Sequence, residues 1–283
     1  MTARAIIIGA PRSGSGKTSV TIGLLRALAR RGLKVRGAKS GPDYIDPGFH
    51  AAATGRPGVN LDSWAMEPDL LATLLGDAAA DADIIVIESA MGLFDGIPGE
   101  AGRSGSAADL ARLYGLPVLL VLDVSGQSQT AAAVAKGFTA YDSQVQIAGV
   151  VLNKLGSVRN KRLARDAIAT LGLPVVGSVL RDSTFTLPER HLGLVQAGEH
   201  GDLDSHIDRL ADAMERSIDL DAVVALAAPV RAAEQDWSFA LPPPVLEGDP
   251  SITVDGQRAF FISSRKAVAE GRGNEDFDIW FVG

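Results

Sequence analysis

Residues 9–19, GAPRSGSGKTS, have the composition of a loop that holds phosphates. An apolar run precedes this segment and a helical pattern follows it, so a strand, a glycine-rich loop and a helix come in succession. In that arrangement, backbone N–H groups of the loop and the helix N-terminus face anionic oxygens. We expect Lys17 to reach the outer phosphates of a nucleotide and the Thr18 hydroxyl to hold Mg²⁺. We call residues 9–19 the phosphate loop.

One position of the phosphate loop departs from the common pattern. Glycine is usual five residues before Gly16, and this chain has Pro11 there. Because proline has no backbone N–H, Pro11 cannot contact a phosphate through an amide. The nucleotide-binding residues that we expect in the loop are Ser13, Gly14, Ser15, Gly16, Lys17, Thr18 and Ser19. The alternative reading is a glycine-rich turn that binds no ligand.

Glu88 is a candidate metal ligand. It ends the apolar run at residues 84–87, where a carboxylate of a phosphate-loop protein commonly meets the metal, directly or through water. Mg²⁺ prefers few protein oxygens together with substrate phosphates. The alternative is an acid at a strand end that is hydrogen-bonded to a neighbouring loop.

Two further acids and a lysine follow the second expected strand. Asp43 and Asp46 lie three residues apart between prolines, and could share a cation or orient a substrate near Mg²⁺. Turn capping is the alternative for both, because aspartate is common in turns. Lys39 could neutralise charge on a phosphoryl group in transfer, or be a solvated lysine at a strand end. Asp95, in a glycine-rich loop after Glu88, is a candidate of the same kind.

Composition excludes several kinds of chemistry. The chain has no cysteine, so disulfides, cysteine-ligated metals and a cysteine nucleophile are excluded. Its four histidines do not have the spacing of a metal site. A net charge of −7 argues against nucleic acid as the main partner. No apolar run is long enough to span a membrane and no signal peptide is recognisable, so we expect a cytoplasmic enzyme without a membrane partner.

Short apolar runs alternate with helical patterns along most of the chain, which predicts a doubly wound, mostly parallel α/β sheet with helices on both faces. The expected strands are 5–9, 34–38, 83–88, 117–123, 147–152 and 174–179. The expected helices are 18–31, 68–80, 107–114, 130–141 and 160–171, with one or two more within 201–228. The polar clusters follow strand ends, where ligands of such sheets bind. We expect this α/β domain to span 1–230, followed at 231–283 by a proline-rich linker and an unassigned tail.

Several segments of the chain resemble the family of cobyrinic and hydrogenobyrinic acid a,c-diamide synthases. They are GPDYIDPGFH at 41–50, ESAMGLFDG at 88–96, GSAADLAR at 105–112, VLDVSG at 121–126, AGVVLNKLG at 148–156 and LPERHLGL at 187–194. The ATP-binding half of this family is similar to dethiobiotin synthetase, a phosphate-loop fold. The resemblance implies ATP- and Mg²⁺-dependent amidation of the a and c carboxylates of a corrin in cobalamin biosynthesis, through an acyl phosphate.

The resemblance also implies roles for individual residues. Lys17, Lys39, Asp43, Asp46 and Asp95 would be catalytic; Thr18, Asp46 and Glu88 would hold the metal. Tyr44, Ser89, Met91, Gly92, Arg190 and His191 would meet the corrin substrate, and Asn153 would face adenine.

The chain departs from the family in its C-terminal part. Family members normally continue into a glutamine amidotransferase domain with a cysteine nucleophile, and we recognise no such domain before Gly283. Ammonia is therefore expected to come from outside this chain, either free or from a glutaminase domain in trans; a homodimer is possible. The alternatives are a dethiobiotin synthetase-like ligase, a nucleotide-dependent switch acting by dimerisation, and an inactive structural remnant. Such switches usually have a lysine early in the loop, where this chain has Pro11 and Arg12.

Overall fold

The computed structural model describes residues 3–182, 189–190, 193–194, 202–230, 260–261 and 279–280. The chain divides into two compact units, Met1–Glu234 and Gln235–Gly283. In the second unit the description covers two short antiparallel strands, β11 (Phe260–Phe261) and β12 (Ile279–Trp280). The rest of this section concerns the first unit.

The first unit is built on an eight-stranded sheet in the order β3-β2-β4-β1-β5-β6-β7, with β10 paired to β1. The strands are β1 (Arg4–Gly9), β2 (Val35–Ser40), β3 (Val59–Leu61), β4 (Ile84–Ser89), β5 (Val118–Asp123), β6 (Ile147–Leu155), β7 (Val175–Leu180) and β10 (Ala228–Pro229). All pairs are parallel except β1 with β10. This confirms the predicted doubly wound α/β fold.

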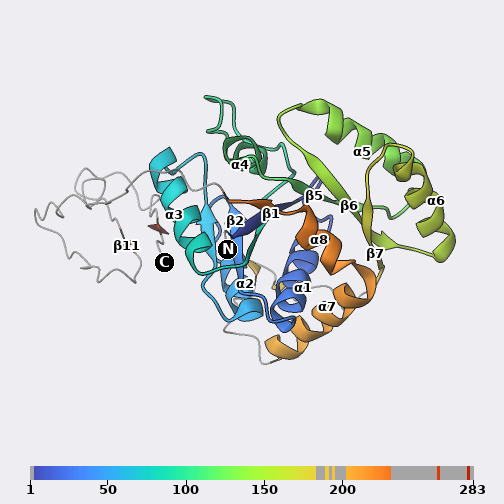
Figure 1. Cartoon of the computed structure of the whole chain (residues 1–283), viewed down its shortest axis with the longest axis horizontal. Coiled ribbons are helices and arrows are strands. Elements are labelled where there is room, and N and C mark those ends of the chain that lie inside the picture. Colours follow the sequence, from blue (N-terminus) through green and yellow to red (C-terminus); the bar gives the residue numbers. More distant parts are fainter. Residues whose placement is uncertain are drawn as a thin grey trace, which may run out of the picture. The chain divides into compact units, whose positions relative to one another are not determined.

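Helices cover both faces of the sheet (Figure 1). They are α1 (Lys17–Arg30), α2 (Asp46–Thr54), α3 (Pro68–Ala80), α4 (Ala107–Tyr114), α5 (Thr130–Tyr141), α6 (Val158–Ala169), α7 (Leu203–Ser217) and α8 (Leu220–Leu226). Buried residues of α1, α2, α7 and α8 form one core, and those of α3 to α6 form the other. Since strand side chains alternate between faces, Ile6 and Ile8 belong to the first core and Ile7 to the second.

Two elements near the site were not predicted. Residues 41–47 were expected to form a loop, but α2 begins at Asp46, with a proline in its first turn. Proline is tolerated there because the first N–H groups of a helix have no intrahelical partner. The three-residue strand β3 was also missed, since its apolar run is too short to stand out. A further antiparallel pair joins β8 (Glu189–Arg190) to β9 (Gly193–Leu194).

Helix α1, which begins at the end of the phosphate loop, is fixed by α7. A Cβ on Gly23 would lie 2.8 Å from the carbonyl oxygen of Leu210, so the helices cross with almost no space between them. Ion pairs flank this crossing, including Arg26–Asp208 at 2.8 Å and Arg30–Asp212 at 2.7 Å. Within the described ranges, no helix is long and apolar enough to cross a membrane.

Candidate functional site

The phosphate loop connects β1 to α1 and brings Lys17 to the first position of the helix. Gly14 and Gly16 have φ values of 73° and 89°, a left-handed conformation that favours glycine. The Lys17 side chain is buried, and its Nζ lies 3.4 Å from the carbonyl oxygen of Arg12. Burial lowers the pKa of Lys17, with the charge of Glu88 acting in the opposite direction. The loop thus has the conformation and the cation expected of a phosphate cradle.

The carboxyl end of β6 holds the phosphate loop from the side. The Asn153 amide donates to the carbonyl of Ser15 over 2.9 Å, and Lys154 Nζ donates to the carbonyl of Gly14 over 2.6 Å. A Cβ on Gly16 would lie 2.2 Å from the Asn153 nitrogen, so this contact also requires glycine in the loop. The structure places Asn153 against the loop backbone; its contact with adenine stays a prediction.

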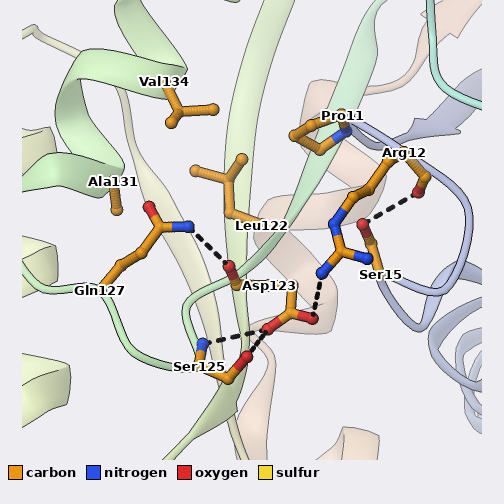
Figure 2. A pocket seen from close by; sticks show the side chains of 9 residues that line it. All are labelled: Pro11, Arg12, Ser15, Leu122, Asp123, Ser125, Gln127, Ala131 and Val134. Atoms are coloured by element: carbon orange, nitrogen blue, oxygen red, sulfur yellow. Dashed lines mark hydrogen bonds and ion pairs between the residues drawn. The ribbon is translucent and has the colours of Figure 1, made fainter.

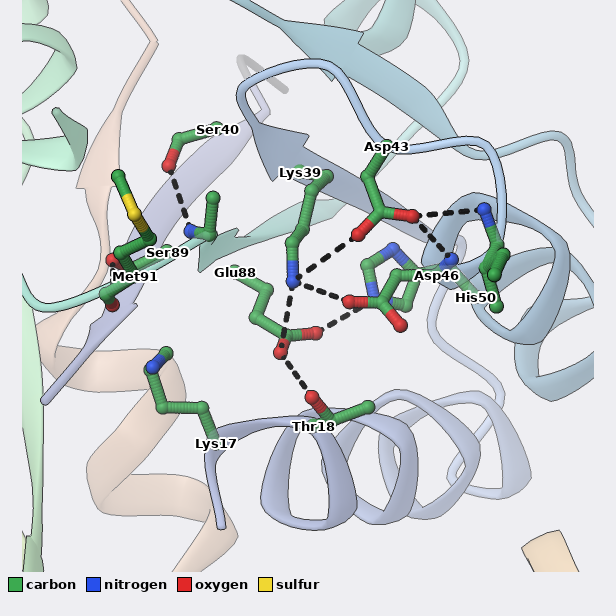
Figure 3. A network of polar contacts seen from close by, with 12 residues as sticks. Lys17, Thr18, Lys39, Ser40, Asp43, Asp46, His50, Glu88, Ser89 and Met91 are labelled. Atoms are coloured by element: carbon green, nitrogen blue, oxygen red, sulfur yellow. Dashed lines mark hydrogen bonds and ion pairs between the residues drawn. The ribbon is translucent and has the colours of Figure 1, made fainter. Parts of the chain in front are cut away.

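The alternation of strand side chains places Lys39 and Glu88 on the same face of the sheet. They are register partners in the neighbouring strands β2 and β4. Both point to the face that α1 and α2 cover, where Thr18 lies in the first turn of α1, and Asp46 and His50 lie on α2 (Figure 3). We call Lys39, Asp43, Asp46, His50 and Glu88 the Lys39 cluster.

Glu88 and His50 are the most enclosed members of the Lys39 cluster, each with an exposure of 0%. Three partners surround the Glu88 carboxylate. Its Oε1 accepts a hydrogen bond of 2.6 Å from the Thr18 hydroxyl and lies 3.2 Å from Lys39 Nζ. Its Oε2 lies 3.1 Å from Nε2 of His50. Glu88 therefore connects the phosphate loop to β2 and α2, and each of these three contacts favours its charged form.

Lys39 lies among three carboxylates. Besides Glu88, its ammonium forms a short ion pair with Asp46 and lies 3.9 Å from Oδ2 of Asp43. The other oxygen of Asp43 accepts from the backbone N–H groups of Ile45 and Asp46, at 2.8 and 3.0 Å. Asp43 therefore caps the start of α2, as the turn-capping alternative expects, and also faces Lys39. Its role toward a metal or a substrate stays a prediction.

The charges of the Lys39 cluster shift one another's pKa values. Burial raises the pKa of Asp46, the charge of Glu88 adds to this, and together they bring it to about 6 against the opposing ammonium of Lys39. For Glu88, burial is outweighed by Lys39 and His50, which hold its pKa well below the usual range. Burial alone would lower the pKa of Lys39, but Glu88 and Asp46 raise it. Lys39 and Glu88 are thus held charged.

The predicted substrate residues lie in different environments. Tyr44 and Met91 are exposed at 65% and 48%, whereas Ser89 is buried and donates to the Met91 carbonyl over 2.8 Å. For Arg190 the structure gives the backbone within β8, and His191 lies outside the described residues.

Gly92 and Asp95 connect the loop after β4 to the phosphate loop. The N–H of Gly92 donates to Asp95 over 2.9 Å, and a Cβ on Gly92 would lie 2.9 Å from the carbonyl oxygen of Pro11. Asp95 therefore shapes the loop that packs against the start of the phosphate loop.

A hollow opens beside the phosphate loop on the side of β5 and α5 (Figure 2). Its volume is about 140 Å³, and Arg12, Asp123 and Gln127 line it. The Arg12 guanidinium lies 3.4 Å from Asp123 and forms an ion pair with it. Arg12 is the cation of this chain near the position where nucleotide-dependent switches usually have a lysine, and here it is engaged by Asp123. A second hollow of about 270 Å³ lies between the loops after β5 and β6 and includes Lys154.

The oxygens of Thr18 and Glu88 fit Mg²⁺. They are hard donors 2.6 Å apart at the end of the phosphate loop, and Asp46 belongs to the same buried charge network. Nowhere in the described part of the chain do three histidine or acidic side chains group so that they could bind a metal by themselves. This suits a metal that takes its remaining ligands from phosphates and water.

Sequence reasoning gave no role to two residues that the structure brings into this region. His50 contacts Glu88, and Lys154 contacts the phosphate loop. A signal for His50 existed, because it follows Asp46 by four residues and so shares its helix face, but only once α2 is known to be a helix. Lys154 follows a predicted strand and was expected at the ligand-binding edge of the sheet, but its contact with Gly14 gave no signal, because it joins residues that are far apart in the chain.

Comparison with known proteins places this site in a family. The model of the CobQ/CobB/MinD/ParA nucleotide-binding domain matches residues 6–195. The hydrogenobyrinate a,c-diamide synthase of Mesorhizobium japonicum is 72% identical over 244 residues, which are 86% of this chain and 56% of that protein. The synthase of the same name from Agrobacterium fabrum is 69% identical over 244 residues, with the same shares.

These relatives confirm the resemblance drawn from the motifs, although the chain spans about half the length of the curated relatives it matches. Among solved structures, chloroplast FtsY from Physcomitrella patens aligns with 18% identity and a TM-score of 0.49, covering 74% of this chain and 66% of that one. The CobQ/CobB/MinD/ParA nucleotide-binding domain model matches more than half of the residues of this chain, and the chain therefore belongs to that family.

Proposed function

We propose that this chain carries the ATP-using site of a ligase that converts the a and c carboxylates of hydrogenobyrinic or cobyrinic acid into amides. The names of its relatives support the substrate. The observation that carries the proposal is the Thr18–Glu88–Lys39 connection, in which the end of the phosphate loop meets a buried lysine held among carboxylates. A site for nucleotide binding alone has no need of a second buried cation next to the loop.

The chemistry would begin with activation of the carboxylate. A corrin carboxylate oxygen attacks the γ-phosphorus of ATP, the bond from this phosphorus to the β,γ-bridging oxygen breaks, and ADP leaves. Ammonia then attacks the acyl carbon, the bond between that carbon and the phosphate oxygen breaks, and phosphate leaves as the nitrogen loses a proton. Without activation the leaving group would be oxide, so transfer of the phosphoryl group supplies a leaving group that ammonia can displace.

In this proposal the chain's residues position charges and do not form covalent bonds. Lys17 would contact the outer phosphates, and Lys39 would stabilise the charge that develops as the phosphoryl group moves. Both ammonium groups are buried, where electrostatic interactions are stronger than in water. Asp43, Asp46 and Asp95 would keep Lys39 and the neighbouring loops in place.

Mg²⁺ would be held by Thr18 and Glu88, with Asp46 close by, and would neutralise charge on the β- and γ-phosphates. Asn153 and the hollow next to Lys154 would receive the base and ribose. Tyr44 and Met91 would contact the corrin with Ser89, Gly92, Arg190 and His191. Ammonia would come from solution or from a glutaminase domain in trans.

Mass spectrometry tests the proposal directly. The purified chain is incubated with ATP, Mg²⁺ and ammonium together with hydrogenobyrinic or cobyrinic acid. We expect the mass change of two conversions of carboxyl to amide, accompanied by ADP formation, and neither product with Lys17→Ala. An unchanged corrin mass under saturating ammonium, from a chain that binds ATP, would contradict the ligase assignment.

A further inference from the structure

His50 contacts the site but has no part in the chemistry proposed above. Its imidazole and the Glu88 carboxylate are both fully buried, and they meet at 3.1 Å. Because a carboxylate only accepts hydrogen bonds, Nε2 of His50 carries the hydrogen and donates it. Nδ1 has no hydrogen-bond partner among the residues that the structure describes. The contact with Glu88 therefore accounts for the polar function of this ring.

The two oxygens of Glu88 have different partners. Oε1 meets Thr18 and Lys39, whereas Oε2 meets His50 (Figure 3). The terminal torsion of a glutamate side chain has a broad energy profile, so the torsion alone does not fix the plane of the carboxylate. The hydrogen bond from His50 holds Oε2 on the side of α2, which leaves Oε1 turned toward the phosphate loop.

The fold makes room for this imidazole. His50 lies one helical turn after Asp46, so α2 presents both side chains to β2 and β4. A Cβ on Gly37 of β2 would lie 2.5 Å from the Cβ of His50, a distance that no other residue could accommodate without a shift. The close approach of α2 to β2 therefore depends on glycine at position 37 and brings the ring within reach of Glu88.

We propose that His50 is a positioning residue, which orients the Glu88 carboxylate toward Mg²⁺ and the nucleotide. The inference rests on the proposed function, since it requires Glu88 to meet the metal. Some residues do not touch a metal but hydrogen-bond to a side chain that does. Removal of such a residue typically lowers metal affinity or activity by about ten- to hundredfold. Loss of the donor at position 50 weakens the binding of Mg²⁺, whereas the backbone amides that hold the phosphates are unaffected.

Three variants separate the hydrogen bond from the bulk of the ring. His50→Leu fills similar space without a donor. His50→Gln carries an N–H donor at a distance from the backbone close to that of Nε2, and His50→Asn has the same amide on a side chain one methylene shorter. Thermal unfolding of each variant shows whether it is folded, and the comparison of glutamine with asparagine remains decisive if leucine is not tolerated.

The measurement is the calorimetric affinity for ADP, taken once with EDTA and once with excess Mg²⁺. The ratio of the two dissociation constants gives the gain in affinity due to the metal. We expect His50→Leu and His50→Asn to lower this gain by about ten- to hundredfold with an unchanged affinity in EDTA. His50→Gln should keep a gain close to that of the parent chain.

Three results would overturn the positioning role. The first is a gain in all three variants that equals the gain of the parent chain. The second is a glutamine variant that behaves like the asparagine variant. The third is a parallel loss of affinity with and without Mg²⁺, which would make His50 a packing residue. If the parent chain itself fails to bind ADP, the proposed function is rejected, and that outcome is distinct from all three.

Discussion

The Asn153 amide donates a hydrogen bond of 2.9 Å to the carbonyl of Ser15, which ties the carboxyl end of β6 to the phosphate loop. Lys154 extends this connection, because its ammonium contacts both the Gly14 carbonyl, at 2.6 Å, and Asp123, at 2.9 Å. Because the carbonyls of Gly14 and Ser15 accept these hydrogen bonds from β6, the N–H groups of the loop remain free to face phosphate oxygens. The end of β6 thus sets the shape of the loop before any nucleotide arrives.

Lys154→Ala should therefore weaken nucleotide binding. It removes a charged hydrogen bond to the loop, and such bonds contribute about 1.5–3 kcal/mol. We expect the calorimetric dissociation constant for ADP to rise about tenfold or more. Lys136→Ala, which removes an exposed lysine on α5, is the control and should leave it unchanged. Equal affinities of Lys154→Ala and the parent chain would show that the loop needs no support from β6.

The backbone of Lys154 is strained as well. Its φ of 55° is the one positive value at a residue other than glycine within the described residues. A residue with a Cβ is destabilised by roughly 1–2 kcal/mol in this left-handed conformation, because the Cβ lies close to a carbonyl oxygen, and glycine is not. Lys154→Gly and Lys154→Ala lose the same ammonium, so the glycine variant should be about 1 kcal/mol more stable in urea unfolding. A glycine variant that is less stable than the alanine variant would contradict this account of the strain.

The sequence allowed the sheet and part of the site to be predicted, for a physical reason. Buried parallel strands are continuous apolar runs, and polar residues at their ends meet at one edge. This brought Lys39 and Glu88 into one hypothesis with the phosphate loop. It could not place Asp46 and His50 on a common helix face, because the prolines of that segment favour a loop reading. It also could not show that Thr18 bonds to Glu88 or that Lys154 supports Gly14, because those contacts depend on packing between distant segments.

Lys17 should be indispensable for ATP. Lys17 is buried at the start of α1, where its ammonium would contact the phosphates of a bound nucleotide. Lys17→Ala should abolish measurable ATP binding in calorimetry, a loss on the order of a hundredfold. Lys34→Ala, at an exposed position before β2, serves as the control. ATP affinity that survives in Lys17→Ala would refute the assignment of the phosphate loop.

Asp46 should make the metal-free chain less stable as the pH rises. Its pKa is raised to about 6 in the folded chain, above the ordinary value of 3.8. A raised pKa contributes stability that is fully present below the unfolded value and is lost as the pH rises through the folded value. Asparagine resembles the protonated acid and does not ionise. The free energy of unfolding of Asp46→Asn should therefore rise relative to that of the parent chain between about pH 4 and 6, by on the order of 1–3 kcal/mol.

Asp208 provides a control of opposite sign. A hydrogen bond from Arg26 lowers its pKa, so the ionised acid contributes stability that is lost as the pH falls through the folded value. Relative to the parent chain, Asp208→Asn should be less stable near neutral pH, and the difference should shrink in acid. Urea unfolding of both variants and the parent, in EDTA from pH 4 to 8, measures these trends. If Asp46→Asn fails to gain as the pH rises while Asp208→Asn behaves as expected, the carboxylate of Asp46 is accommodated by Lys39 without cost. That result would mean that the ionised Asp46 does not destabilise the metal-free chain. A role in binding Mg²⁺ would then not be needed to offset a loss of stability.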